Sequence, residues 1–464
     1  MSGCKLLSTM MAGAALVLCG GAGAMDDADL AQILDRRIQG DLSGACVAAA
    51  LIQGERVTRA WRCADPADAG RIGPEVAFEI GSVTKTMAGI LLADLIASGE
   101  ASLDDTLAGH LPTGAAVPDF QGQPIRLRHL VTHTSGLPRL PSRLRITDAA
   151  DPYAGLGADD LLASLQDVTL AQAPGEVFEY SNFGTMLLSL MLARASGMDF
   201  EQLVTAKLFR PLDMDQAYVA RRPDGVRAAV GHLASGEQTA AWTFAPELSG
   251  VGGVRATLDD MVRYVQAQFG GAPEPLGAAI ALAQQPIESA AQQAMAMNWL
   301  LMPLAGRQVH MHDGGTGGFS AMIAFDLAGE RGVVVLADAG LATSGGVNDL
   351  GAHLLDPSLP LAQPRRPVSR PAVAPSLTAQ QLQAYAGTWA LMPQFDLVLR
   401  ERDGVLHGQA TGQGEFALAP VAEDVFEAAA LGIEIRFSRD DSGQVTQMEL
   451  HQAGQVLPAQ RGGQ

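Results

Sequence analysis

The pattern of apolar and polar residues predicts one sheet built from two distant parts of the chain. Residues 29–42 have apolar side chains at helical spacing, and two strand-like runs follow between residues 46 and 63. Strand patterns return far downstream, in RQVHMHDGG (307–315), SAMIAFDL (320–327) and GVVVLAD (332–338). The long middle segment, residues 103–269, is rich in helix and loop patterns. We therefore expect an α/β domain, residues 25–356, with a helical insert between its two strand regions.

A different pattern begins after a proline-rich segment. Six prolines lie between residues 357 and 375, which predicts an extended linker over 357–377. From 378 to 464 the chain shows short alternating strands, including a hairpin turn at Asp403-Gly404. We expect this part to be a small antiparallel β domain.

The first 24 residues have the composition of a secretory signal peptide. Lys5 precedes an apolar run from Leu6 to Leu18, and small residues lead to Ala24. The apolar run is shorter than a membrane-spanning helix needs. We expect cleavage after Ala24 and export to the periplasm or the medium.

Export changes the interpretation of the cysteines, because only Cys46 and Cys63 remain after cleavage. Both are equally far from a turn at Gly54-Glu55, so an antiparallel hairpin would place them opposite each other. An oxidising compartment favours a disulfide between them. Two free buried thiols are the alternative.

Charge narrows the range of partners. The 464 residues include 50 acidic and 31 basic side chains, which gives a formal charge of −19. Nucleic-acid-binding proteins have the opposite balance, so we expect no nucleic-acid partner.

The stretch FEIGSVTKTMAG, residues 78–89, contains Ser82 and Lys85 just before an apolar helical pattern. Ser82 could cap that helix, since a serine oxygen accepts backbone N–H groups. Alternatively, Ser82 is a nucleophile. Lys85 would then lie on the same helix face and accept the proton, provided that burial lowers its pKa.

Two further stretches contain polar groups suited to a hydrolytic site. EYSNFG (179–184) contains Tyr180, a candidate acid or base, and Asn182, a candidate partner for a substrate amide; an ordinary turn before a helix is the alternative. In HMHDGGTGGFS (310–320), His310 and His312 share one strand face, as zinc ligands can. The adjacent acid is on the other face and no further ligand lies nearby, so we expect no metal. The glycines instead suit close approach of a substrate.

In this order, Ser82-x-x-Lys85, Tyr180-x-Asn182 and His312-Asp313-Gly314 resemble the penicillin-recognising serine hydrolases. The resemblance is closest to class C β-lactamases and the related D-alanyl-D-alanine carboxypeptidases and esterases. It extends over about residues 28–356 and includes flanking segments at 78–82, 129–138 and 249–264.

The resemblance implies a fold and a division of roles. The fold is an antiparallel sheet flanked by helices, with a helical subdomain. The roles are nucleophile (Ser82), proton transfer (Lys85, Tyr180), substrate binding (Asn182, His312, Gly314, Gly315), oxyanion hole (N–H groups of Ser82 and Gly315) and structural support (His129, His133). No metal or organic cofactor is implied, and the substrate is a small β-lactam or a D-alanyl peptide.

Two departures from the class C pattern affect the choice of substrate. His312 replaces a lysine, so its charge near neutral pH is conditional, and carboxylate recognition is expected to weaken or depend on pH. YAGTWA (385–390) resembles the first strand of a lipocalin-like barrel, which the minimal lactamase lacks. The class C-like flank favours β-lactam hydrolysis, whereas both departures favour D-alanyl peptide hydrolysis. An esterase and a penicillin-binding sensor that does not turn over are further alternatives.

Overall fold

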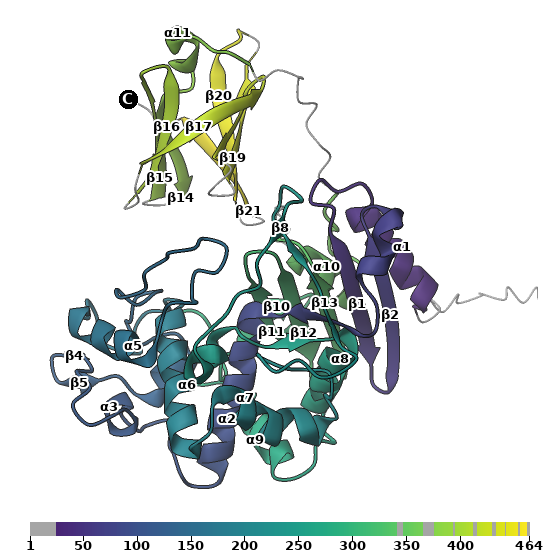
Figure 1. Ribbon diagram of the computed structural model, residues 1–464, viewed down its shortest axis with the longest axis vertical. Coiled ribbons are helices and arrows are strands. Elements are labelled where there is room, and N and C mark those ends of the chain that lie inside the picture. The colour runs from purple at the N-terminus through teal and green to yellow at the C-terminus, as the bar shows by residue number, and fades with distance from the viewer. Residues whose placement is uncertain are drawn as a thin grey trace, which may run out of the picture.

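The computed structural model describes most of the chain, beginning with a sheet flanked by helices (Figure 1). The described residues are 25–340, 347–364, 375–392, 395–411, 415–428, 433–440, 442–452 and 455–461. The expected signal peptide and the middle of the expected linker, residues 365–374, lie outside this set.

The main sheet joins the N-terminal hairpin, which ends at Cys63, to strands that begin only at Leu300. Its strands are β1 (Cys46–Gln53), β2 (Arg56–Cys63), β10 (Leu300–Leu304), β11 (Arg307–Gly315), β12 (Ser320–Asp326) and β13 (Arg331–Ala337). They lie in the order β10-β11-β12-β13-β1-β2, and every neighbouring pair is antiparallel. Ala49 of β1 pairs with Val335 of β13 at the junction. The predicted sheet built from two distant segments is therefore confirmed.

Helices cover both faces of this sheet. The longer helices in the described residues are α1 (Asp27–Ile38), α2 (Thr84–Ala97), α6 (Asn182–Ser196), α8 (Leu258–Gln266), α9 (Leu276–Ala283) and α10 (Asn348–Leu355). The shorter ones are α3 (Leu107–His110), α4 (Leu127–Val131), α5 (Ala158–Ser164), α7 (Phe200–Val204) and α11 (Ala379–Leu382). Leu34 of α1 and Leu350 of α10 share a core with Val333 on one face, whereas Val262 of α8 belongs to the core on the other. The helical region built on α2, α6 and α9 continues that second core.

Short ladders complete the first part of the chain. β3 (Val76–Glu79) lies between β6 (Arg227–Ala228) and β9 (Arg255–Ala256), and the two-residue pairs are β4 (Asp119–Phe120) with β5 (Gln123–Pro124) and β7 (Gly231–His232) with β8 (Gln238–Thr239). A buried ion pair of 3.0 Å joins Glu79 to Arg255 across β3 and β9. Because β3 leads into the short 3-10 turn η2 (Gly81–Val83), this ladder fixes the entry to Ser82.

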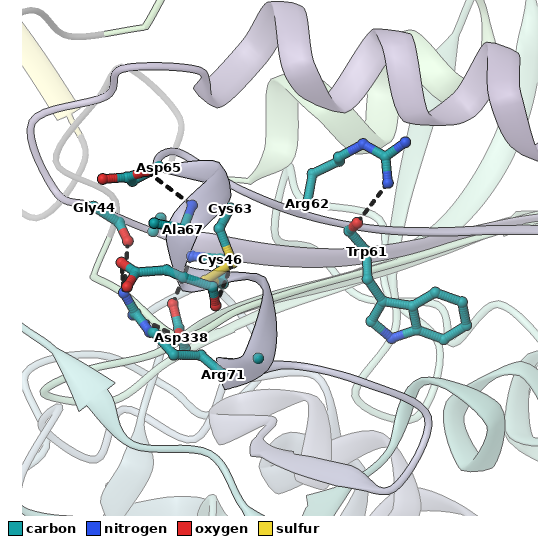
Figure 2. The surroundings of a disulfide bond; sticks show 12 residues. Gly44, Cys46, Trp61, Arg62, Cys63, Asp65, Ala67, Arg71 and Asp338 are labelled. Carbon is teal, nitrogen blue, oxygen red and sulfur yellow. Dashed lines mark hydrogen bonds and ion pairs between the residues drawn. A yellow bond between two sulfur atoms is a disulfide. The ribbon is translucent and has the colours of Figure 1, made fainter.

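Cys46 and Cys63 pair at the end of the hairpin formed by β1 and β2 (Figure 2). Cys46 and Cys63 are directly opposite in the register, and their sulfurs form a disulfide. The Cys46 N–H donates to one oxygen of Asp338 at 2.7 Å, and Arg71 donates to the other at 2.7 Å. The predicted pairing is thus present, and β13 is joined to it through Asp338.

The C-terminal part is a closed antiparallel barrel of eight strands in the described residues. They are β14 (Gly387–Met392), β15 (Phe395–Arg402), β16 (Val405–Ala410), β17 (Glu415–Ala422), β18 (Val425–Ala428), β19 (Ile433–Arg439), β20 (Val445–Gln452) and β21 (Gln455–Arg461). Trp389 and Phe426 are fully buried in its own core. The turn at Asp403-Gly404 has φ values of 53° and 78°, and the small β domain expected from the sequence is confirmed.

Across the described ranges, no helix combines the length and the apolar character that crossing a membrane requires.

Candidate active site

Ser82 lies in η2, between the end of β3 and the start of α2. Gly81 precedes it with φ at +50°, and a Cβ there would stand 2.8 Å from the Gly315 nitrogen. Only glycine fits this left-handed, crowded position. The N-cap of α2 is Val83, with no capping side chain, so the helix-cap interpretation of Ser82 is wrong.

The Ser82 hydroxyl is paired with Lys85 in the first turn of α2. The Lys85 Nζ donates to Ser82 Oγ at 2.9 Å and to the Val251 carbonyl at 2.6 Å. Lys85 is fully buried, and this burial lowers its pKa well below the usual value; the Arg139 charge lowers it further. A neutral amine next to a serine hydroxyl can accept its proton.

Tyr180 brings a phenol to the same hydroxyl. Its pKa is raised by burial, and a hydrogen bond with the Ser82 side chain offsets part of this rise. The Lys85 Nζ lies 5.3 Å from the centroid of the Tyr180 ring. The phenol therefore keeps its proton at neutral pH and can donate it.

The expected structural histidines hold the surrounding loops. His133 is buried, lies 4.3 Å from the Tyr180 ring between centroids, and accepts the Ser181 N–H through Nδ1 at 3.3 Å. His129 accepts the Arg126 N–H through Nδ1 at 3.1 Å at the start of α4. His133 thus fixes the backbone next to Tyr180, which the sequence alone does not indicate.

Asn182 is the first residue of α6. The Ser181 hydroxyl caps this helix by accepting the Gly184 N–H at 2.9 Å. The Asn182 amide nitrogen donates to the Tyr153 hydroxyl at 3.2 Å, while its buried Oδ1 has no partner among the described residues. That oxygen is available to accept a substrate N–H.

His312 differs from the expectation that its charge is conditional near neutral pH. Its side chain is buried, and this desolvation lowers its pKa to about 4, although the Asp313 charge opposes the shift. His312 Nδ1 contacts the Asp313 carbonyl at 2.6 Å, and its buried Nε2 has no partner within the described chain. His312 is therefore neutral at pH 7. His310 contacts the Gln284 carbonyl at 3.0 Å and stacks on Phe325, and the described residues contain no cluster of three or more metal-ligating side chains.

The glycines of β11 allow this strand to touch the nucleophile turn. A Cβ on Gly314 would collide with the Ile80 carbonyl and lie 2.9 Å from the Ser82 nitrogen. The Gly315 nitrogen in turn lies against Gly81. The glycines of β11 and the turn that carries Ser82 are therefore in close backbone contact. The oxyanion hole expected from the N–H groups of Ser82 and Gly315 stays a prediction.

These groups open into a cavity of about 450 Å³. Ser82, Tyr180, Asn182, Gly314 and Gly315 line it, whereas Lys85 and His312 lie behind its surface. Its other lining residues are Gly81, Arg139, Leu140, Tyr153, Trp242, Phe244, Val251, Gly252 and Asp313.

Sequence reasoning missed part of this lining. Tyr153 packs against Trp242 at 5.3 Å and Phe244 at 5.2 Å between ring centroids, which forms one aromatic wall. These rings come from loops whose pattern gives no indication of a site. Arg139 directly follows the family-like segment 129–138, and that adjacency was the one available clue.

A Ser–Lys pair with a half-buried tyrosine and a glycine-lined strand edge defines an active-site serine hydrolase of the penicillin-recognising class. The chain belongs to the β-lactamase family, whose sequence pattern matches residues 30–353. Residues 371–461 match a domain of unknown function, DUF3471.

Individual relatives agree with this assignment. A β-lactamase of Escherichia coli (strain K12) is 28% identical over 62% of this chain and 82% of its own length. The D-alanyl-D-alanine-carboxypeptidase/endopeptidase AmpH of the same strain is 33% identical over 48% of this chain, and the match spans 57% of that relative.

Solved structures share the fold. A β-lactamase/D-alanine carboxypeptidase from Yersinia pestis has a TM-score of 0.58 at 24% identity and covers 70% of this chain and 99% of its own. A class C β-lactamase has a TM-score of 0.60 at 21% identity, covering 74% and 99%. SurE with D-Leu has a TM-score of 0.56 at 20% identity and covers 94% of this chain and 99% of its own, so its match extends beyond the first domain.

Proposed function

We propose that this protein is an exported serine hydrolase that cleaves a β-lactam or a related acyl-D-alanyl amide through an acyl-enzyme on Ser82. The observation that carries the proposal is the 2.9 Å hydrogen bond between the Ser82 hydroxyl and the buried Lys85 amine. Burial disfavours the charged form of the Lys85 amine, and a serine next to such an amine can be activated for attack on a carbonyl carbon.

The proposed acylation assigns a role to each group of the site. Ser82 Oγ attacks the carbonyl carbon while Lys85 takes the hydroxyl proton, and the N–H groups of Ser82 and Gly315 stabilise the oxyanion. Tyr180 donates its proton to the leaving nitrogen, and Lys85 restores it. Water then attacks the ester, which releases the acid and frees Ser82. Asn182 and the edge of β11 hold the substrate.

D-alanyl-D-alanine carboxypeptidase or endopeptidase activity is the second candidate. The neutral state of His312 favours it, because the cleft differs at this position from the lysine of the class C pattern. The 33% identity to AmpH points to the same substrate class.

The test compares the purified protein with Ser82→Ala on a chromogenic cephalosporin, a D-Ala-D-Ala peptide and a nitrophenyl ester. We expect turnover of at least one substrate, with a loss of roughly 10³-fold or more in Ser82→Ala. Full activity in that variant would contradict the mechanism. A labelled penicillin that stays on the protein indefinitely would instead identify a sensor, and turnover confined to the ester would identify an esterase.

Export forms a separate part of the proposal, and it rests on the composition of residues 1–24. Expression in a bacterial host followed by mass measurement of the periplasmic protein tests it. A mature chain that begins at Met25 is the expected result, and an intact N-terminus in the cytoplasmic fraction would contradict it.

A further inference from the structure

The cleft contains one positive charge that a substrate can reach. Of the described residues that line it, Arg139 is the only basic one and Asp313 the only acidic one. Lys85 and His312 are both fully buried, and burial disfavours their charged forms. Among the described residues that line the cleft, Arg139 is thus the one that can supply a counter-charge to an anionic group of the substrate.

The backbone of Arg139 is fixed, and its side chain is exposed. Its carbonyl accepts N–H groups from Asn182 at 3.0 Å and Phe183 at 3.2 Å, which ties it to the start of α6. No acid in the described part of the chain forms an ion pair with its guanidinium. The guanidinium thus lies at the cleft without an acidic partner among the described residues, and it can bind a planar anion through two parallel hydrogen bonds.

The position of the guanidinium indicates which end of the substrate it meets. It lies 5.4 Å from the centroid of the Tyr180 ring, and Tyr180 is the proposed proton donor to the leaving nitrogen. Arg139 therefore belongs to the leaving-group side. Asp313, held by Asn348 at 3.4 Å, adds a negative charge on the β11 side that repels an anion.

We infer that Arg139 binds a carboxylate on the leaving-group side of the substrate and selects acyl donors that carry one. The inference rests on the proposed function, because it requires acyl transfer to Ser82 with a departing group next to Tyr180. It adds a carboxylate subsite to that reaction and assigns one residue to it.

Two aryl esters of the same acyl-D-alanine test the inference, one with a meta-carboxylate on its phenol and one without. The wild type should prefer the anionic ester, and Arg139→Gln should lower kcat/KM for it by about 10- to 100-fold through KM. The same variant should leave the neutral ester almost unchanged. Arg139→Lys should restore part of the preference. Arg145→Gln, at an exposed arginine of the same loop that does not line the cleft, should keep all of it.

The kinetic results distinguish a failure of the carboxylate subsite from a failure of the proposed function. An equal loss on both esters would show that Arg139 acts on folding or on the pKa of Lys85 or Tyr180, and would overturn the inference. A wild type that hydrolyses both esters equally well would overturn it while leaving the Ser82 mechanism intact. Failure to release phenol from either ester would overturn the proposed function and the carboxylate subsite together. Thermal melting of each variant checks that the exposed substitution leaves the fold intact.

Discussion

The hydrolase domain and the C-terminal barrel both have aromatic cores, but the ionisable groups around the hydrolase cleft differ in burial and pairing from the ion pairs of the barrel. In the barrel, Arg402 pairs with Glu415 and Arg439 with Asp424, both at 2.7 Å and near the surface. In the hydrolase domain, Lys85, His133 and His312 are fully buried, and none has an ion pair among the described residues.

The comparison separates charged side chains that stabilise the fold from buried bases that take part in the proposed reaction. Surface pairs such as those of the barrel contribute about 0–1 kcal/mol each. Burying a base without a counter-charge destabilises the fold unless the base becomes neutral, and such groups concentrate at active sites. The three buried bases all lie around Tyr180, at the cleft to which the proposed chemistry is assigned.

Replacing Lys85 is expected to give the largest effect, a large loss of activity with little loss of stability. Lys85→Met preserves most of the buried volume but removes the proton acceptor, so kcat/KM should fall on the order of 10³-fold. The free energy of unfolding should change by only about 1 kcal/mol, because the lost hydrogen bonds are offset by relief from burying an amine. Urea unfolding and steady-state kinetics measure both quantities.

Lys207→Met, at a surface lysine paired with Asp94, is the matched control and should keep full activity. A free energy of unfolding that is much lower in Lys85→Met than in the wild type would show that Lys85 stabilises the fold, and would contradict this prediction.

The contact between β11 and the nucleophile turn should show the next largest effect. Gly314→Ala places a Cβ against the Ile80 carbonyl and near the Ser82 nitrogen, so the turn must move. A displacement of this kind should cost about 10²-fold in the acylation rate. Gly315→Ala meets nothing nearer than the Phe319 carbonyl at 3.7 Å and should lose much less. Equal losses in the two variants, measured with the same ester, would exclude this steric explanation.

A core substitution in the barrel should have the reverse effect, a large loss of stability with no loss of activity. Trp389 is fully buried in the barrel core, and Trp389→Ala should destabilise that domain by about 3–5 kcal/mol. Because the barrel core is separate from those of the hydrolase domain, kcat on a small ester should stay at the wild-type value. Calorimetry should show one transition moving to lower temperature. A parallel loss of kcat would show that the barrel supports the catalytic site.

Local patterns in the sequence were enough to predict much of the fold. The hairpin register follows from the two cysteines and their turn, and the period-two runs after residue 300 identify the remaining strands. The pair Ser82 and Lys85 is also local, since one helical turn brings the two side chains together.

The rest of the site depends on packing between distant segments. Arg139, Trp242 and Phe244 reach the cleft from irregular loops, whose spacing carries no period. The neutral state of His312 depends on how deeply β11 is covered, which its neighbours in sequence do not reveal.

The smallest expected effect concerns the acid stability of the buried histidines. Burial lowers the pKa of folded His312 to about 4 from an ordinary 6.5, so between these values the unfolded chain binds more protons. The contribution of this histidine is therefore complete above pH 6.5 and is lost as the pH falls towards 4. In His312→Gln, the fall in unfolding free energy over this range should be shallower by at most about 1.4 kcal/mol per pH unit. Identical slopes for His312→Gln and the wild type in urea titrations at pH 4.5, 5.5 and 7 would show that the pKa of folded His312 is not lowered.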